Sequence, residues 1–531
     1  MASNLTRREL FALAWGVALI EPTDAASATP ACAPVASCPV DDLVGRFMRE
    51  FSIPGIGIAI VQPGQAPLAR GYGVRRLGDA MPVDAHTQFA IASNSKAFLA
   101  ACFALLVDAG ALGWDDPVRK HLPEFEMHDP AVSAMMTVRD LFVHRSGLPL
   151  GAGDLLQFPA SDRTPGDVLH ALRYLKPSTG FRAGYAYDNC LYIVAGILLE
   201  RVSGLDWNHY VAERLFAPLG MHDAVPNASL LRGSNHAARH ARIGPPVRGM
   251  GRLAVVQPDE TDLIGPAGGI SVSVTGIIPW LQVQLGRGTL PDGRRLWTEA
   301  QSAEMWKPQT ITASTEGPTA ALPQRGVLEA YALGWFVGDY RGRRSLWHRG
   351  TVSGQRTHTV LLPEQGIGFV VYSNTEDAEP VAGLRYALLD WLLGGSEFDW
   401  VAATKRDIAA AQSQVLRVVS HDEFTVPAGG PTLPLDRYAG RYRDAWYGDI
   451  VVSCRRDRLA IDFTHTPTLK GPLEVFGVDT FRSRFGVGVE DVVVAFRREN
   501  GAVAGLSMRA LSPMADFSFD YHDLSPVRVS P

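Results

Sequence analysis

Strand-like segments stand on both sides of a long helical region within the first four hundred residues. Gly55 to Gln62 (GIGIAIVQ) is a short β-rich run, turn residues follow it, and Pro67 to Arg75 reads as a return strand. Helical periodicity dominates from Ser93 to about Leu285. Further strands are expected at Tyr331 to Val337, Ser345 to His348, His358 to Leu362 and Gly366 to Ser373. A sheet that joins both ends predicts an α/β layer fold.

A second domain follows a linker. Helical spacing from Val401 to Val419 leads into the turn-forming stretch at 427–431 (PAGGP). Beyond it, Asn500-Gly501 is a hairpin turn among short strands. These strands are expected at Ile450 to Cys454, Leu459 to Phe463, Leu473 to Phe476, Asp491 to Phe496, Val503 to Met508 and Phe517 to Tyr521. About six short strands in about one hundred residues predict a small antiparallel barrel or sandwich.

The charge balance excludes several classes of partner. The 531 residues include 50 Lys and Arg and 55 Asp and Glu, which gives a formal net charge of −5. Such a chain has no global basic field, so we expect no nucleic-acid partner. No stretch is long and apolar enough for a membrane span. Five cysteines are too few for a disulfide scaffold, and whether Cys32 and Cys38 pair stays open.

The N-terminus has the order of an export signal. Arg7 and Arg8 precede an apolar run from Leu10 to Ile20, and small residues follow at 25–28 (AASA). The paired arginines resemble a twin-arginine signal. We therefore expect an exported protein of the bacterial periplasm.

The tetrad Ser93-Asn94-Ser95-Lys96 opens a segment with helical spacing. A serine hydroxyl is almost wholly protonated at neutral pH, so it needs a base within hydrogen-bond reach. At positions i and i+3 of a helix, Ser93 and Lys96 lie on one face, and the first turn adds free N–H groups. Lys96 can act as the base if burial lowers its pKa. Alone, the pattern is common, and a serine cap followed by a solvated lysine is the ordinary alternative.

Two further motifs stand later in the chain: Tyr187-x-Asn189 within GYAYDN and His348-x-Gly350 within WHRGT. Together with Ser93-x-x-Lys96 they occupy, in order, the three motifs of the serine β-lactamase and penicillin-binding protein superfamily. The chain resembles its branch of class C β-lactamases, D-aminopeptidases and related esterases over roughly residues 41–395. The resemblance implies an antiparallel sheet flanked by helices, plus an all-helical region.

The resemblance also implies roles for the later motifs. Tyr187 would be a general base or proton relay, with a pKa that the neighbouring ammonium lowers. Asn189 would bind the lysine and the acyl-side amide of the substrate. His348 would lie on the sheet edge facing the nucleophile, and Gly350 would let substrate approach the strand closely. The backbone N–H groups of Ser93 and Thr351 would form the oxyanion hole.

The tail resembles a second known domain. Leu435 to Tyr442 (LDRYAGRY) and the strands after it are similar to the lipocalin-like domain attached to many such hydrolases. It could cover part of the active-site cleft or be a structural cap, and both readings stay open. The expected organisation is a signal at 1–28, a linker at 29–40, a hydrolase domain at 41–398, a helix and linker at 399–433 and a lipocalin-like β domain at 434–531.

Two departures from the family pattern bear on function. The third motif begins with His348 where β-lactamases usually carry lysine, and a mostly neutral imidazole is a poor partner for a substrate carboxylate. Position 188 is Asp where the family often has Ser or Ala. The histidine favours aminopeptidase or esterase substrates over β-lactams.

We therefore predict an exported serine hydrolase that works through a Ser93 acyl-enzyme on small peptide, amide or ester substrates. A peptidase acting on short or linearised cyclic peptides is favoured, ahead of a carboxylesterase and a class C-like β-lactamase. A catalytically silent binding or sensor protein is the alternative of another class. We expect no cofactor and no metal, since His236 and His240 have i, i+4 spacing without a third ligand. The oligomeric state stays open.

Overall fold

The computed structural model describes residues 40–395, 397–420, 429–486, 489–512 and 515–530. The expected export signal, Cys32, Cys38 and most of the predicted linker at 29–40 lie outside the described residues, as does part of the linker after residue 420. Val40, placed in that first linker, already belongs to a helix.

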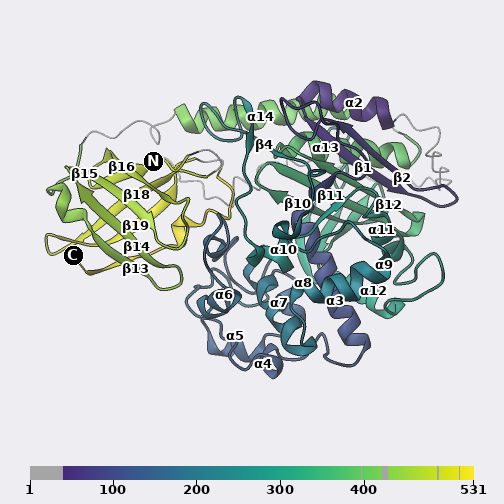
Figure 1. Ribbon diagram of the computed structural model, residues 1–531, viewed down its shortest axis with the longest axis horizontal. Coiled ribbons are helices and arrows are strands. Elements are labelled where there is room, and N and C mark those ends of the chain that lie inside the picture. The colour runs from purple at the N-terminus through teal and green to yellow at the C-terminus, as the bar shows by residue number, and fades with distance from the viewer. Residues whose placement is uncertain (1–39, 396, 421–428, 487–488, 513–514, 531) are drawn as a thin grey trace.

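An eight-stranded antiparallel sheet forms the centre of the first domain and confirms the predicted α/β layer fold (Figure 1). Its order is β2-β1-β12-β11-β10-β9-β8-β7, so the N-terminal hairpin pairs with a late strand. The strands are β1 (Gly55–Val61), β2 (Leu68–Gly73), β7 (Thr310–Ser314), β8 (Leu328–Tyr331), β9 (Phe336–Tyr340), β10 (Arg343–Val352), β11 (Gln355–Leu362) and β12 (Ile367–Ser373).

Helices cover both faces of this sheet. Along β1, Ile56, Ile58 and Ile60 pack in the core with helices α2 (Val40–Phe51) and α13 (Ala378–Leu392). The intervening Ala59 packs on the other face, in the core that contains α3 (Ser95–Asp108). This period-two division explains why a strand buried on both sides reads as an unbroken apolar run.

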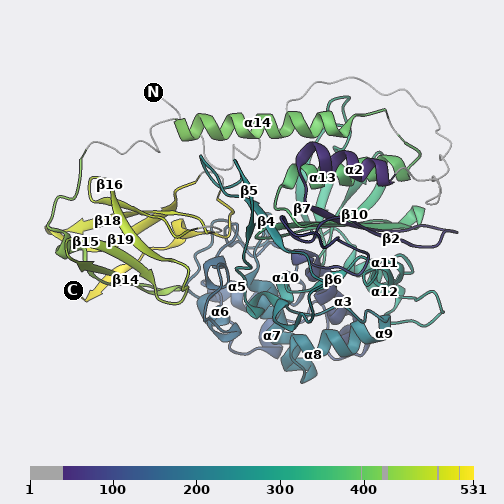
Figure 2. The same cartoon turned by 45° about the horizontal axis from the view of Figure 1, so that its top comes forward.

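The remaining helices and two small ribbons lie between the sheet strands in sequence (Figure 2). The ribbons pair β3 (Gln88–Ala90) with β6 (Ser271–Ser273) and β4 (Arg239–Arg242) with β5 (Leu253–Val256). The helices are α4 (Val118–His121), α5 (Pro130–Met135), α6 (Pro165–Ala171), α7 (Cys190–Ser203), α8 (Trp207–Val211), α9 (Ala217–Leu219), α10 (Gly265–Gly268), α11 (Ile278–Leu285) and α12 (Glu299–Met305).

The single strand predicted from Tyr331 to Val337 is wrong. The segment holds the end of β8, a turn and the start of β9. In this turn Gly334 has φ +76°, and a Cβ there would stand 2.7 Å from the backbone oxygen of Lys96. The turn therefore packs directly on the helix that carries Lys96, which a side chain at 334 would prevent.

A closed eight-stranded antiparallel barrel forms the second domain, which confirms the barrel alternative of the prediction. Sequential strands pair with one another and β20 closes on β13. The strands are β13 (Gly440–Asp444), β14 (Gly448–Arg455), β15 (Arg458–Phe463), β16 (Lys470–Gly477), β17 (Thr480–Ser483), β18 (Val492–Glu499), β19 (Ala502–Ala510) and β20 (Val527–Ser530). The sequence analysis missed β13, β17 and β20.

The strand predicted from Phe517 to Tyr521 is also wrong. Residues 517–520 form an irregular segment that runs into a 3₁₀ turn at Tyr521–Asp523. Its polar side chains bond to the first domain instead of alternating across a sheet, so tertiary contacts override the local strand pattern.

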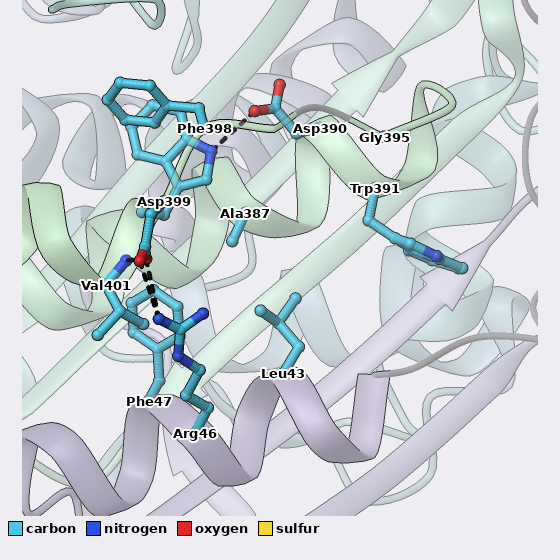
Figure 3. A pocket seen from close by; sticks show the side chains of 11 residues that line it. Leu43, Arg46, Phe47, Ala387, Asp390, Trp391, Gly395, Phe398, Asp399 and Val401 are labelled. Carbon is cyan, nitrogen blue, oxygen red and sulfur yellow. Dashed lines mark hydrogen bonds and ion pairs between the residues drawn. The ribbon is translucent and has the colours of Figure 1, made fainter.

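Helix α14 (Trp400–Ser420) leads away from the first domain towards the barrel (Figure 2). Where it begins, a pocket of about 210 Å³ lies between α2, α13 and α14 (Figure 3). Arg46 donates to Asp399 at 3.0 Å beside it, and Trp400 donates to Asp390 at 2.8 Å. Among the described residues, no helix combines the length and the apolar character needed to cross a membrane.

Candidate active site

Ser93 stands in a one-turn 3₁₀ segment, Ala92–Asn94, immediately before α3. Within residues 91–100 it is the one side chain that is not buried. Ala92 has φ +48°, a left-handed conformation that is costly for a residue with a Cβ. The Asn94 amide holds the turn by donating to the backbone oxygen of Ile91 and to the hydroxyl of Thr357 on β11, each at 2.8 Å.

Lys96 is fully buried and has three polar partners. Its Nζ lies 2.7 Å from Oδ1 of Asn189, 2.8 Å from the backbone oxygen of Ala267 and 3.3 Å from Oγ of Ser93. Burial lowers the pKa of Lys96 to about 7, although the charges of Asp154 and Asp188 act in the opposite direction. A neutral amine has two N–H groups and one lone pair. Two carbonyl oxygens can take the N–H groups, which leaves the lone pair for the hydroxyl proton of Ser93.

Tyr187 completes the contact set around the nucleophile. Its phenol donates to Oγ of Ser93 at 2.7 Å, and its ring lies 4.8 Å from Nζ of Lys96. The structure thus brings together the hydroxyl, the amine and the phenol that the sequence singled out. The expected lowering of the Tyr187 pKa is wrong in direction. Burial raises that pKa well above its ordinary value, so the phenol acts as a proton donor at neutral pH.

Asn189 links Lys96 to a carboxylate that the sequence analysis missed. Its Oδ1 accepts from Lys96, and its Nδ2 donates to the two oxygens of Asp154 at 3.2 and 3.0 Å. Asp154 is fully buried, and burial raises its pKa to about 7. It lies in the loop sequence GAGDLLQ, which matches none of the motifs considered, so no local signal identifies it.

His348 is a neutral, fully hydrogen-bonded imidazole. Nδ1 donates to the backbone oxygen of Arg349 at 2.7 Å, and Nε2 accepts from the phenol of Tyr331 at 2.9 Å. Burial lowers its pKa to about 3. Strand β10 lies inside the sheet rather than at its edge, but its pairs with β9 end at Trp347, so the half that follows is paired with β11 alone.

Gly350 makes room for protein backbone rather than for substrate. A Cβ at this position would stand 2.1 Å from the backbone oxygen of Ile91 and 2.8 Å from the Asn94 amide nitrogen. The glycine therefore allows β10 to lie directly against the nucleophile turn. Thr351 follows on the same strand, half-buried, and its role in an oxyanion hole stays a prediction.

Asp188 and His144 support the site from below. Asp188 is fully buried and accepts the N–H of Leu191 at 2.9 Å in the first turn of α7. Burial raises its pKa to about 6. The Nδ1 of His144 accepts the backbone N–H of Asp188 at 3.2 Å, and its ring packs 4.2 Å from that of Tyr187. This is the packing role expected for His144.

No group of three or more metal-ligating side chains that could hold an ion occurs in the described parts of the chain. The ring of His240 is used within the fold, since its Nδ1 donates to the backbone oxygen of Asn374 and its Nε2 accepts the N–H of Leu77. The site's chemistry therefore rests on the hydroxyl, amine, phenol and amide described above.

Comparisons with known proteins agree with this geometry. The family model described as Beta-lactamase matches residues 40–390, and a domain of unknown function (DUF3471) matches residues 425–527. The unguisins hydrolase ungD' of Aspergillus campestris is 28% identical over 435 residues, which cover 78% of each chain.

Solved structures show the same fold. The octameric penicillin-binding protein homologue of Pyrococcus abyssi aligns over 92% of this chain and 99% of its own, with a TM-score of 0.55 and 19% identity. The D-amino acid amidase of Ochrobactrum anthropi aligns over 71% of this chain and 100% of its own, with a TM-score of 0.52 and 20% identity.

Proposed function

Because the chain belongs to the beta-lactamase family, whose members are serine hydrolases, we propose that it hydrolyses small peptides or amides through an acyl-enzyme on Ser93. The observation that carries the proposal is the contact set of Lys96, whose two carbonyl partners direct its lone pair at the Ser93 hydroxyl. We further propose export to the bacterial periplasm, which the order of residues 7–28 supports and sequencing of the mature N-terminus would test.

Acylation begins with transfer of the Ser93 proton to Lys96 as Oγ bonds to the substrate carbonyl carbon. The carbonyl oxygen gains the negative charge, which the backbone N–H groups of Ser93 and Thr351 would stabilise. When the tetrahedral intermediate collapses, the leaving group takes up a proton. The Tyr187 phenol, 2.7 Å from Oγ, is the donor nearest to that position. Water then attacks the acyl-enzyme and releases the acid.

The state of His348 favours peptidase or esterase chemistry over β-lactam hydrolysis. A β-lactam presents a carboxylate, and the lysine usual at this position would meet it with a positive charge. Here the imidazole is neutral and both of its nitrogens are already bonded within the protein. The hydrolase name of the fungal relative supports a peptide substrate.

A substrate panel tests the proposal. Purified protein would be incubated with D- and L-aminoacyl anilides, short linear peptides, p-nitrophenyl esters and nitrocefin, and a fluorophosphonate would report acylation of Ser93. We expect amide turnover to exceed nitrocefin turnover, activity to persist in a chelator, and the adduct to map to Ser93. Turnover of esters alone would favour the esterase, and faster nitrocefin turnover would favour the β-lactamase. A folded protein without an adduct would favour a binding protein.

Tyr187→Phe should separate the two proton transfers. The variant keeps the ring and the contact between Ser93 and Lys96 but loses the phenol proton, so we expect kcat for an anilide to fall about 10²- to 10³-fold. A p-nitrophenyl ester should lose less, because p-nitrophenolate leaves without being protonated. Steady-state rates on the two substrates measure the difference. Equal losses on both would contradict a role in protonating the leaving group.

A further inference from the structure

An irregular segment of the barrel domain, residues 515–520, reaches the loop that carries Asp154. The carboxylate of Asp520 accepts the backbone N–H groups of Gly153 at 2.8 Å and Leu155 at 3.1 Å. These bonds hold the main chain on both sides of Asp154. Asp520 and Asp154 are both fully buried. The barrel therefore fixes the backbone from which Asp154 projects.

The same segment also binds the Asp154 side chain. The hydroxyl of Ser518 donates to Oδ2 at 2.7 Å, and the amide of Gln157 donates to Oδ1 at 2.8 Å. The third donor is Nδ2 of Asn189. Three donor groups converge on a carboxylate that has no contact with solvent, so its position is fixed from three directions.

The orientation of the Asn189 amide matters for Lys96. The two ends of an amide have nearly the same shape, and their partners decide which end points where. Lys96 needs the oxygen, because an amide NH₂ cannot accept its N–H group. A carboxylate accepts and does not donate, so Asp154 selects the NH₂ end and leaves the oxygen for Lys96.

We propose that Asp154 is a positioning residue that keeps the carbonyl end of Asn189 on Lys96, and that Ser518 of the barrel holds Asp154 in this role. The inference rests on the proposed function, since it concerns the activation of Ser93. It makes the barrel part of the catalytic apparatus through a hydrogen-bond chain that runs from Ser518 through Asp154 and Asn189 to Lys96.

Removing the charge of Asp154 should also alter the protonation of Lys96. Several titratable groups face the lysine: Asp154, Asp188, His144, His348, Tyr187 and Tyr192. Among them, the charges of the two carboxylates favour the ammonium form. In Asp154→Asn the neutral amine becomes easier to form, so the acidic limb of the pH profile should move to lower pH even as the rate falls.

The test uses the full chain and the rate at which a fluorophosphonate labels Ser93, measured from pH 5 to 9. We expect Asp154→Asn to slow labelling about 10- to 100-fold on the plateau, the range common for residues that orient a functional group. Its acidic limb should move down by about one pH unit. Ser518→Ala should slow labelling several-fold, and the double variant should be no slower than Asp154→Asn, because both changes act on one carboxylate. Ser453→Ala, an exposed serine on β14, is the matched control.

Each outcome decides between the two claims. Labelling of wild-type Ser93 with unchanged rates in both variants would overturn the positioning role alone. An unmoved acidic limb, or effects that multiply in the double variant, would do the same. Absence of labelling in folded wild-type protein would overturn the proposed function and this inference with it. Should Asp154→Asn fail to fold, as thermal unfolding would reveal, Ser518→Ala carries the test because it removes a single hydroxyl.

Discussion

Replacing Ser93 by alanine should reduce kcat by about 10⁶-fold, to the level that binding alone supports. The reason is that neither Lys96 nor Tyr187 can replace the nucleophile, since both act on the proton of this hydroxyl. The loss should appear on every substrate that the wild-type protein turns over, and KM should change little. Rates from single-turnover and steady-state assays, together with the mass of the fluorophosphonate adduct, measure it.

The control for this variant is structural. Ser93 is half-buried in a turn that Asn94 and Ser95 hold through their own hydrogen bonds, so alanine should leave the thermal unfolding temperature close to that of wild type. Ser453→Ala should keep full activity. If Ser93→Ala retained turnover, or if the adduct mapped to another residue, the acyl-enzyme would have been assigned to the wrong side chain.

Sequence reasoning succeeded where chemistry and spacing are local. Ser93 and Lys96 lie one helical turn apart, and the order of the three motifs placed Tyr187 and Asn189 beside them. The apolar run from Gly55 announced a buried strand, and the turn at Asn500 announced a hairpin, because both depend on neighbouring residues alone. The layer fold followed from strands at both ends of the first domain.

It failed where contacts between distant residues decide the outcome. Asp154 matches no motif, and its importance arises from Asn189 and Ser518, which are distant in sequence. The segment from Phe517 has strand-like alternation, yet Asp520 bonds to the other domain and prevents pairing. The Tyr187 pKa was predicted in the wrong direction because burial, which sequence does not reveal, outweighs the nearby amine.

Removing the amine of Lys96 should reduce kcat by about 10³- to 10⁴-fold and abolish the acidic limb of the pH profile. In the wild-type protein the base must be neutral. Burial lowers the Lys96 pKa to about 7, so kcat/KM should rise about tenfold per pH unit below that value and level off above it. Lys96→Met keeps much of the side-chain length without a titratable group, whereas Lys96→Arg keeps a positive charge that does not titrate below pH 12. If Lys96 is the base, both variants should be slow and flat across pH 5–9. Should Lys96→Arg retain most of the rate, the side chain would serve as a fixed charge that stabilises the oxyanion, and the proton of Ser93 would have to leave through Tyr187.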